Sequence, residues 1–404
     1  MGRGRWLVGG GLAALLLLGT GCGMTGAGGP QPIRIGTLLS PALQVGPWLS
    51  AVKAAAREAN AHGGIHGRPV QVDNCDDHVD PNLAQQCARK LASDHVIATT
   101  GDFTEFGNVE APLLDQDGIP EVGPFTLSQE ESKLPTSFPW QGGNINTLVS
   151  LMFGIKRRGL TTLYMAAWDV PAEIALVQTA RNFAARAGIQ IVGQELIPSV
   201  ATNYSSYVRQ AIDAHSDAFY AAMPPAAQIN FLATARTLGA KFVVALPEGE
   251  LSPDDRERIG GAQAVIEGDI EYGAFPPVSA SAQFPALRTF QRDMDAEYRA
   301  GDKDAAPGFR SGGAMAAWLS AQIVIHLAMK LPSVTAATLL KALQTSTNVD
   351  TLGLTVPWNP NQPGPPQFPR SLVPSGWFSS QTHGDAVLTD PAPFDTFQAM
   401  GYPG

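Results

Sequence analysis

Residues 58–72 read EANAHGGIHGRPVQV and join a helix to a strand. Apolar residues recur at helical spacing from Leu49 to Ala59, which predicts a helix with one buried face. Pro69 to Val72 predicts the strand that follows, and Ile33 to Leu39 predicts a strand before the helix. A strand, a helix and a second strand in this order are typical of a parallel α/β sheet.

The alternation of strands and helices continues along the chain and then repeats. Two successive runs of such units predict two parallel sheets, each covered on both faces by helices. The further strands predicted in these runs are 96–100, 119–122, 162–166, 189–195, 218–221 and 242–246. The later part of the chain predicts three helices, 284–299, 311–330 and 335–345, and then an irregular Pro-rich stretch, 357–369.

The N-terminus has the layout of an export signal. Arg3 and Arg5 precede an apolar run from Trp6 to Leu18, which is too short for a membrane span of about 20 residues. Small residues then lead to Cys22, so residues 1–21 are predicted to be a signal peptide and residues 22–32 a flexible tether. The order resembles a bacterial lipoprotein processing site, at which Cys22 would carry lipid. Gly19 stands where such sites prefer Leu, so a cleaved and unlipidated protein is the alternative.

Composition and motifs argue against several function classes. The net charge is −9 and becomes −11 without the two arginines of the signal, so no basic nucleic-acid footprint is present. The glycines at 21, 23 and 26 have dinucleotide-loop spacing but follow no strand, and the acidic run 73–77 lacks the Gly and distal Glu of a calcium loop. No nucleophile elbow, zinc-protease motif or P-loop occurs in the sequence. We therefore expect no catalytic residue, metal or cofactor.

Cys75 and Cys87 remain once Cys22 is assigned to lipid. Export permits a disulfide, and two remaining cysteines fit one. Cys87 also lies on the apolar stripe of a predicted helix, so a buried free thiol is the alternative.

Several segments, in order, resemble the type I solute-binding proteins of branched-chain amino acid ABC transporters. Residues 58–68 match the turn N-x-x-G-G-[IV]-x-G-[RK] that follows the first helix of those proteins, and residues 70–77 match their next strand and its D-D pair. Residues 96–101 resemble their third strand, 117–122 their G-I-P strand, and 201–206 their x-T-D-F-S segment. The resemblance extends from about residue 33 to about residue 345.

The resemblance implies an α/β fold of two Rossmann-like lobes joined by three hinge crossings, near 143–147, 271–276 and 350–357. The first lobe would comprise residues 33–144 and 275–352. The second would comprise residues 145–274 and 353–404. Because open parallel sheets bind ligands at the carboxyl ends of their strands, the cleft between the lobes is the expected site.

Two loops of the first lobe match the positions at which this family holds an amino acid. The resemblance assigns them the ligand residues Asp102, Phe103, Thr104, Phe106, Phe125, Thr126 and Ser128. Their hydroxyl groups would donate to a carboxylate, although helix capping would explain the same residues. Gln44 is a further candidate in the loop after the first strand.

Three candidates lie in the second lobe. Glu248 follows a strand in the segment L-P-E-G, where the family's glutamate faces the ligand ammonium; a solvated acidic turn is the alternative. Trp168 and Asp169 stand where members carry an aspartate followed by Y-G, but Val170 and Pro171 replace that pair. Trp168 would then either stack on the ligand or pack in the core. The aromatic residues predict a bulkier or flatter ligand than a small aliphatic amino acid.

The resemblance implies a monomer that passes an amino-acid-like solute to ABC permease subunits and is held by lipid at the outer face of the cytoplasmic membrane. A sensing module for small amides or aromatic acids is the alternative of the same fold. A secreted enzyme is a further alternative, disfavoured because no nucleophile and base pair is recognisable.

Overall fold

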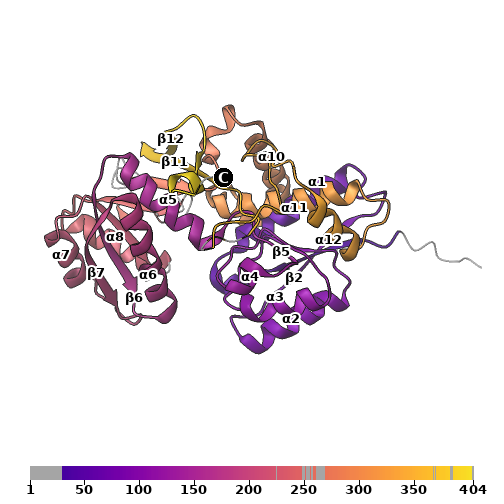
Figure 1. The fold of residues 1–404 in the computed structure, drawn as a ribbon, viewed down its shortest axis with the longest axis horizontal. Helices are drawn as coiled ribbons and strands as arrows, with labels where there is room; N and C mark the ends of the chain where they lie inside the picture. The colour runs from indigo at the N-terminus through magenta and orange to yellow at the C-terminus, as the bar shows by residue number, and fades with distance from the viewer. Residues whose placement is uncertain are drawn as a thin grey trace, which may run out of the picture.

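The computed structural model describes residues 30–223, 225–247, 251, 255, 258–260, 269–366, 368, 370–382 and 385–402. The predicted signal peptide and Cys22 lie outside these residues. Two α/β lobes lie side by side in Figure 1. This confirms the predicted fold class of two mostly parallel sheets flanked by helices.

The sheet of the first lobe has five parallel strands in the order β2-β1-β3-β4-β5. Its first two strands are long and pair over six residues from Ile33 and Val70. The other three shorten to two residues each. The strands are β1 (Ile33–Leu38), β2 (Val70–Cys75), β3 (Thr99–Thr100), β4 (Glu121–Val122) and β5 (Ser137–Phe138).

Helices cover both faces of this sheet. One face packs against α1 (Gly46–Ala61), α10 (Pro285–Arg299) and α11 (Gly312–Met329), and the other against α2 (Pro81–Ser93) and α3 (Gly107–Gln116). Asp80 caps α2 by accepting hydrogen bonds from Asn82 N and Leu83 N. Cys75 of β2 and Cys87 of α2 form a disulfide. The short α4 (Gln129–Lys133) and α12 (Ala336–Thr345) complete the lobe.

Within the part of the chain that the structure describes, α11 is the one helix long and apolar enough to cross a membrane. It is 72% buried inside the protein, and both Trp318 and Leu319 are fully buried in the core that it shares with α1. Burial in this core explains why the helix is so apolar, and α11 is therefore the central helix of the first lobe.

The sheet of the second lobe has the order β12-β11-β10-β9-β8-β6-β7, and β13 (Phe394–Asp395) pairs with β11. Strands β6 to β10 run parallel, whereas β11 and β12 are antiparallel additions. The sequence did not predict these two strands. The strands are β6 (Thr162–Trp168), β7 (Gln190–Ile197), β8 (Ala218–Ala222), β9 (Val243–Pro247), β10 (Ile270–Gly273), β11 (Ser375–Thr382) and β12 (Asp385–Leu388).

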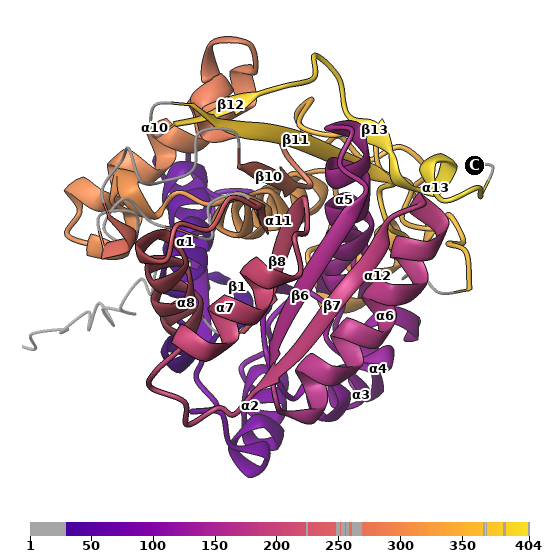
Figure 2. The same ribbon diagram turned by 90° about the vertical axis from the view of Figure 1, so that its left-hand side faces the viewer.

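Helices again lie on both faces, as Figure 2 shows around β6, β7 and β8. One core forms beneath α5 (Gly143–Arg157) and α6 (Pro171–Ala187), and the second beneath α7 (Ser205–Asp213) and α8 (Pro225–Thr237). Phe219 of β8 stacks on Phe231 at 4.8 Å and on Phe242 at 4.9 Å between ring centroids in the second of these cores.

The chain passes between the lobes between β5 and α5, between β10 and α10, and again before β11. The tail differs in one respect from the expected division at residue 353. Leu354 and Trp358 are buried in the core of the first lobe, and Trp358 packs edge-on against Phe138 at 6.4 Å. Trp358 is held there because its Nε1 donates to the carbonyl of Ser371 at 2.6 Å. The tail therefore joins the second lobe at β11.

Candidate functional site

A cleft of about 1380 Å³ separates the two lobes. The first lobe lines it with the segment before α1, the loops after β3 and β4, and the start of α11. The second lobe lines it with the starts of α5 and α6 and with the carboxyl ends of β8, β9 and β10. Residues of both lobes therefore meet at the carboxyl edges of the sheets, where α/β folds bind ligands.

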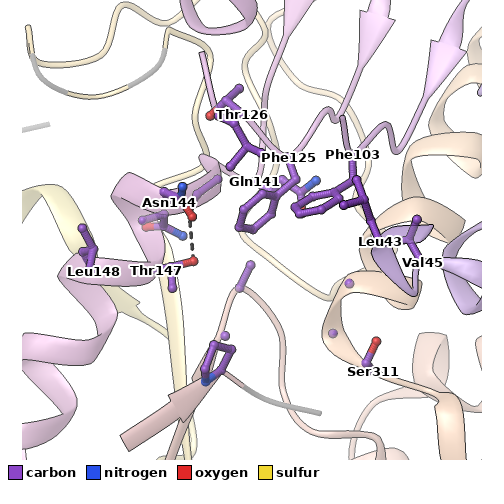
Figure 3. A pocket seen from close by; sticks show the side chains of 18 of the residues that line it. Leu43, Val45, Phe103, Phe125, Thr126, Gln141, Asn144, Thr147, Leu148 and Ser311 are labelled. Carbon is purple, nitrogen blue, oxygen red and sulfur yellow. Dashed lines mark hydrogen bonds between the residues drawn. The ribbon is translucent and has the colours of Figure 1, made fainter. Parts of the chain in front are cut away.

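Three aromatic rings form one wall of this cleft. The ring centroids of Trp48 and Phe103 are 5.4 Å apart, those of Phe103 and Phe125 are 5.5 Å apart, and those of Trp48 and Phe125 are 6.1 Å apart. Figure 3 shows Phe103 and Phe125 side by side. Gly313 makes room for this cluster, because a Cβ there would lie 2.2 Å from the Trp48 ring. The wall offers a large apolar surface to a ligand body.

Two helices begin at the cleft. Helix α11 begins after Ser311, whose Oγ accepts from Ala314 N at 3.2 Å, and helix α5 begins at Gly143. A Cβ on Gly143 would lie 2.5 Å from Thr126 O, so only glycine allows α5 to start this close to the loop of the first lobe. The first backbone N–H groups of a helix lack partners within the helix and favour an anionic group.

Five of the residues predicted from the sequence line the cleft: Gln44, Phe103, Phe125, Thr126 and Ser128. Ser128 also caps α4, because its Oγ accepts from Glu131 N at 3.2 Å. The structure therefore has the helix cap at Ser128, and the ligand role of the same side chain stays a prediction. Glu248 lies outside the described residues.

The other predicted residues do not line the cleft. Asp102 is buried, and its Oδ1 accepts from Leu38 N at 2.8 Å. The hydroxyl of Thr104 donates to Asp77 Oδ2 at 3.3 Å and accepts from Phe106 N at 3.0 Å, which shapes the loop from inside. Trp168 packs against the core beneath α7 and α8, and Asp169 is exposed.

Four carboxyl groups lie buried behind the loops that line the cleft: Asp102, Glu110, Glu121 and Glu131. Burial raises the pKa of Asp102 to about 7 and the pKa of Glu121 well above its usual range. Burial likewise raises the pKa of Glu110 to about 9, and the negative charges of Asp77, Asp102 and Glu131 add to this. Each group thus holds its proton to a higher pH because its neighbours are apolar or acidic.

Glu131 connects this buried group to the cleft. Its Oε2 accepts from Leu127 N at 3.1 Å, from Ser128 N at 2.8 Å and from Ser128 Oγ at 2.8 Å. These hydrogen bonds lower its pKa, but burial is the larger effect and raises the pKa to about 7. The conformation of the cleft-lining segment Phe125 to Ser128 therefore depends on this carboxyl group.

Several cleft residues were not predicted from the sequence: Glu105, Gln141, Asn146, Glu173 and Tyr272. Glu105 lies between the predicted ligand residues Thr104 and Phe106, and Glu173 lies four residues after Asp169, so their positions carried a usable signal. Gln141 precedes α5 and Asn146 lies in its first turn, and neither position follows a predicted strand, so the sequence pattern offered no reason to choose them. No group of three or more His, Cys, Asp or Glu residues that could hold a metal occurs in the described ranges.

Two lobes that both contribute to one cleft at their strand ends define the class of two-lobed ligand-binding proteins. A family model described as periplasmic binding protein matches residues 33–367. The chain therefore belongs to the periplasmic binding protein family, and its fold is that of type I members. Proteins of this family bind solutes, and membership implies an extracytoplasmic location.

Solved structures share this fold at low sequence identity. An extracellular ligand-binding receptor from Verminephrobacter eiseniae is 16% identical, with a TM-score of 0.72 over 88% of this chain and 99% of its own. A fatty acid ABC transporter substrate-binding protein from Thermomonospora curvata is 17% identical, with a TM-score of 0.72 over 92% and 94%. A possible leucine/isoleucine/valine-binding protein from Rhodopirellula baltica is 13% identical, with a TM-score of 0.71 over 90% and 97%. A search of curated proteins found no match.

Proposed function

We propose that this protein is the substrate-binding component of an ABC importer and captures a small amino-acid-like solute between its lobes. The observation that carries the proposal is the cleft of about 1380 Å³ lined by side chains from both lobes. A ligand in such a cleft contacts both lobes only when they approach, so its binding energy favours the closed state. The closed form would then be presented to the permease subunits.

The chemistry of the lining supports an amphipathic ligand. The aromatic wall of Trp48, Phe103 and Phe125 suits an apolar body, and the helix starts at Gly143 and Ser311 supply N–H donors for a carboxylate. Among the structural relatives, one is named for leucine, isoleucine and valine and another for fatty acids, both of which combine an apolar body with a carboxylate. In this proposal Asp102 and Thr104 hold the ligand loop from behind through their hydrogen bonds with Leu38 and Asp77.

The finer parts of the proposal concern the membrane. We propose that residues 1–21 are a signal peptide, that Cys22 carries lipid at the outer face of the cytoplasmic membrane, and that the protein works as a monomer. Globomycin treatment of cells expressing the full chain would leave an uncleaved precursor if Cys22 is lipidated. Unchanged processing would overturn the anchor and leave solute binding in place.

Ligand binding is tested on the body that begins after the tether. Its melting temperature is followed with amino acids, small amides, aromatic acids and fatty acids, and the radius of gyration is measured with each ligand that binds. A ligand at a hundred times its Kd raises the free energy of unfolding by about 2.7 kcal/mol. Trp48→Ala should reduce the shift in melting temperature, whereas Leu196→Ala, which changes an exposed side chain of β7 outside the cleft, should keep it. A ligand that binds equally well to both variants would contradict the cleft as the site.

A further inference from the structure

Besides the helix N–H groups at Gly143 and Ser311, the cleft lining carries two carboxyl groups, one from each lobe. Glu105 follows β3 in the first lobe, Glu173 lies in the first turn of α6 in the second lobe, and both line the cleft. Burial raises the pKa of both groups, and the negative charge of Asp77 adds to this at Glu105 and that of Glu105 at Glu173. Among the described residues, neither carboxyl group has a hydrogen bond or an ion pair.

Two buried amides add acceptors, and their orientation follows from their partners. Gln141 Nε2 donates to the carbonyl of Gly123 at 2.7 Å, and Asn146 Nδ2 donates to the carbonyl of Ser375 at 3.3 Å. A carbonyl accepts only from the amide nitrogen, so in both side chains the oxygen is the free end. Gln141 is 7% exposed and Asn146 is 4% exposed, and both line the cleft. Asn146 Oδ1 is fully buried and has no partner in the described part of the chain.

The two basic side chains of the described lining, Lys133 and Arg258, each contact a nearby residue of their own segment. Lys133 Nζ donates to Gln129 Oε1 at 2.8 Å, and Arg258 Nη1 lies 3.7 Å from Asp255 Oδ1. Asp304 adds a further acidic side chain to the wall of the first lobe. Among the described residues, neither basic side chain forms an ion pair with Glu105 or Glu173. Bringing the lobes together moves two like charges into a space with less water, which is unfavourable.

We propose that the ligand is an organic cation whose N–H-bearing nitrogen group binds between Glu105 and Glu173, with Gln141 and Asn146 as further acceptors and the aromatic wall around its apolar body. The inference rests on the proposed solute-binding function and names the chemical class of its ligand. The cation would couple recognition to closure, because it replaces the repulsion between the lobes with two charge-assisted interactions. A neutral or anionic solute of the same shape leaves the repulsion in place.

Three probes of similar size share the same aromatic ring and differ only in their charged groups. Phenethylamine carries only the cation, phenylalanine carries both charges, and phenylacetate carries only the anion. Calorimetry at pH 7.5 on the protein body should give binding of the first two and none of the third. If phenylacetate binds and phenethylamine does not, the inference is wrong, but the proposed solute-binding function is unaffected. No binding and no compaction with any probe, or with the wider panel above, would overturn the inference and the proposed function together.

Variants test the two carboxyl groups directly. Glu173→Gln and Glu105→Gln should each weaken the binding of phenethylamine by about tenfold or more, because a neutral amide oxygen replaces the charged acceptor of the hydrogen bond. Asp213→Asn, at the exposed end of α7, removes the same charge away from the cleft and should bind as the wild type does.

Both carboxyl groups also lie near helix starts, where a negative charge stabilises the helix. A purely structural role therefore has to be distinguished from ligand binding. A structural role predicts lower melting temperatures of the ligand-free variants and no change in shape. The cation site predicts a smaller radius of gyration for ligand-free Glu173→Gln in X-ray scattering, because the repulsion is relieved. Wild-type affinity for phenethylamine in both glutamine variants would refute the site.

Discussion

Glu110 gives the sharpest test of the buried carboxyl groups behind the ligand loops. Its carboxyl is buried in α3, and its pKa rises from the usual 4.5 to about 9. The unfolded chain therefore loses this proton near pH 4.5, while the folded protein keeps it until about pH 9. A group with a raised pKa costs stability as the pH rises between these two values, and full stability is present only below the lower one.

The size of the effect follows from the linkage between proton binding and folding. Each pH unit between the two pKa values costs about 1.4 kcal/mol, so the interval from pH 5 to pH 7.5 costs about 3 kcal/mol for this residue alone. Glutamine has nearly the same shape and cannot ionise. Glu110→Gln should therefore match the wild type at pH 5 and exceed its free energy of unfolding by about 3 kcal/mol at pH 7.5.

Urea unfolding at several pH values measures this difference, provided that the dependence on urea stays the same in both proteins. Asp213→Asn serves as the control, because it removes an exposed carboxylate from α7. Its free energy of unfolding should depend on pH as that of the wild type does. Parallel curves for Glu110→Gln and the wild type from pH 5 to pH 7.5 would refute the reasoning, because they would show that Glu110 titrates alike in the folded and unfolded chain.

Three further perturbations address the frame and the wall of the cleft. Replacing both Cys75 and Cys87 by serine should lower the free energy of unfolding by roughly 3 kcal/mol, since the bond closes a loop across a separation of 12 residues; unfolding in urea measures it, and an unchanged midpoint would contradict it. Trp358→Ala should lower the free energy of unfolding by roughly 3–5 kcal/mol, because the ring is fully buried in the first lobe. Thermal unfolding measures this loss, and an unchanged melting temperature would contradict it. Trp48→Ala should weaken any ligand of the cleft at least about fivefold in calorimetry, as expected for an aromatic anchor, and unaltered affinity would exclude the ring from the site.

Much of the fold could be predicted because buried parallel strands are short apolar runs bounded by turns. The strand at Ile33 and the strand at Ala218 were predicted on this ground, and the structure has both. Strands β11 and β12 were missed, because the segment from Ser375 to Leu388 mixes small polar residues with two aromatic ones and has no clear alternation. Its pairing with β10 is a long-range contact that local pattern does not encode.

The candidate site was only partly predictable for a related reason. The loops after strands could be located, but alternation stops at the end of a strand and does not say which side chains turn outward. Phe103 faces the cleft, whereas its neighbours Asp102 and Thr104 turn inward to hydrogen bonds with Leu38 and Asp77. Gln141 and Glu173 come from segments far apart in sequence, and only the folded arrangement brings them to one space.

Neither lobe is built from one continuous piece of chain. The first sheet is covered by α10 and α11, which are made only after the whole parallel part of the second sheet, and β11 reaches the second lobe from the last thirty or so residues. Such distant contacts slow folding, and a chain cut short during synthesis can complete neither core. If the proposed signal peptide directs export of the unfolded chain, this delay would keep the polypeptide able to pass through a secretion channel while it is being made.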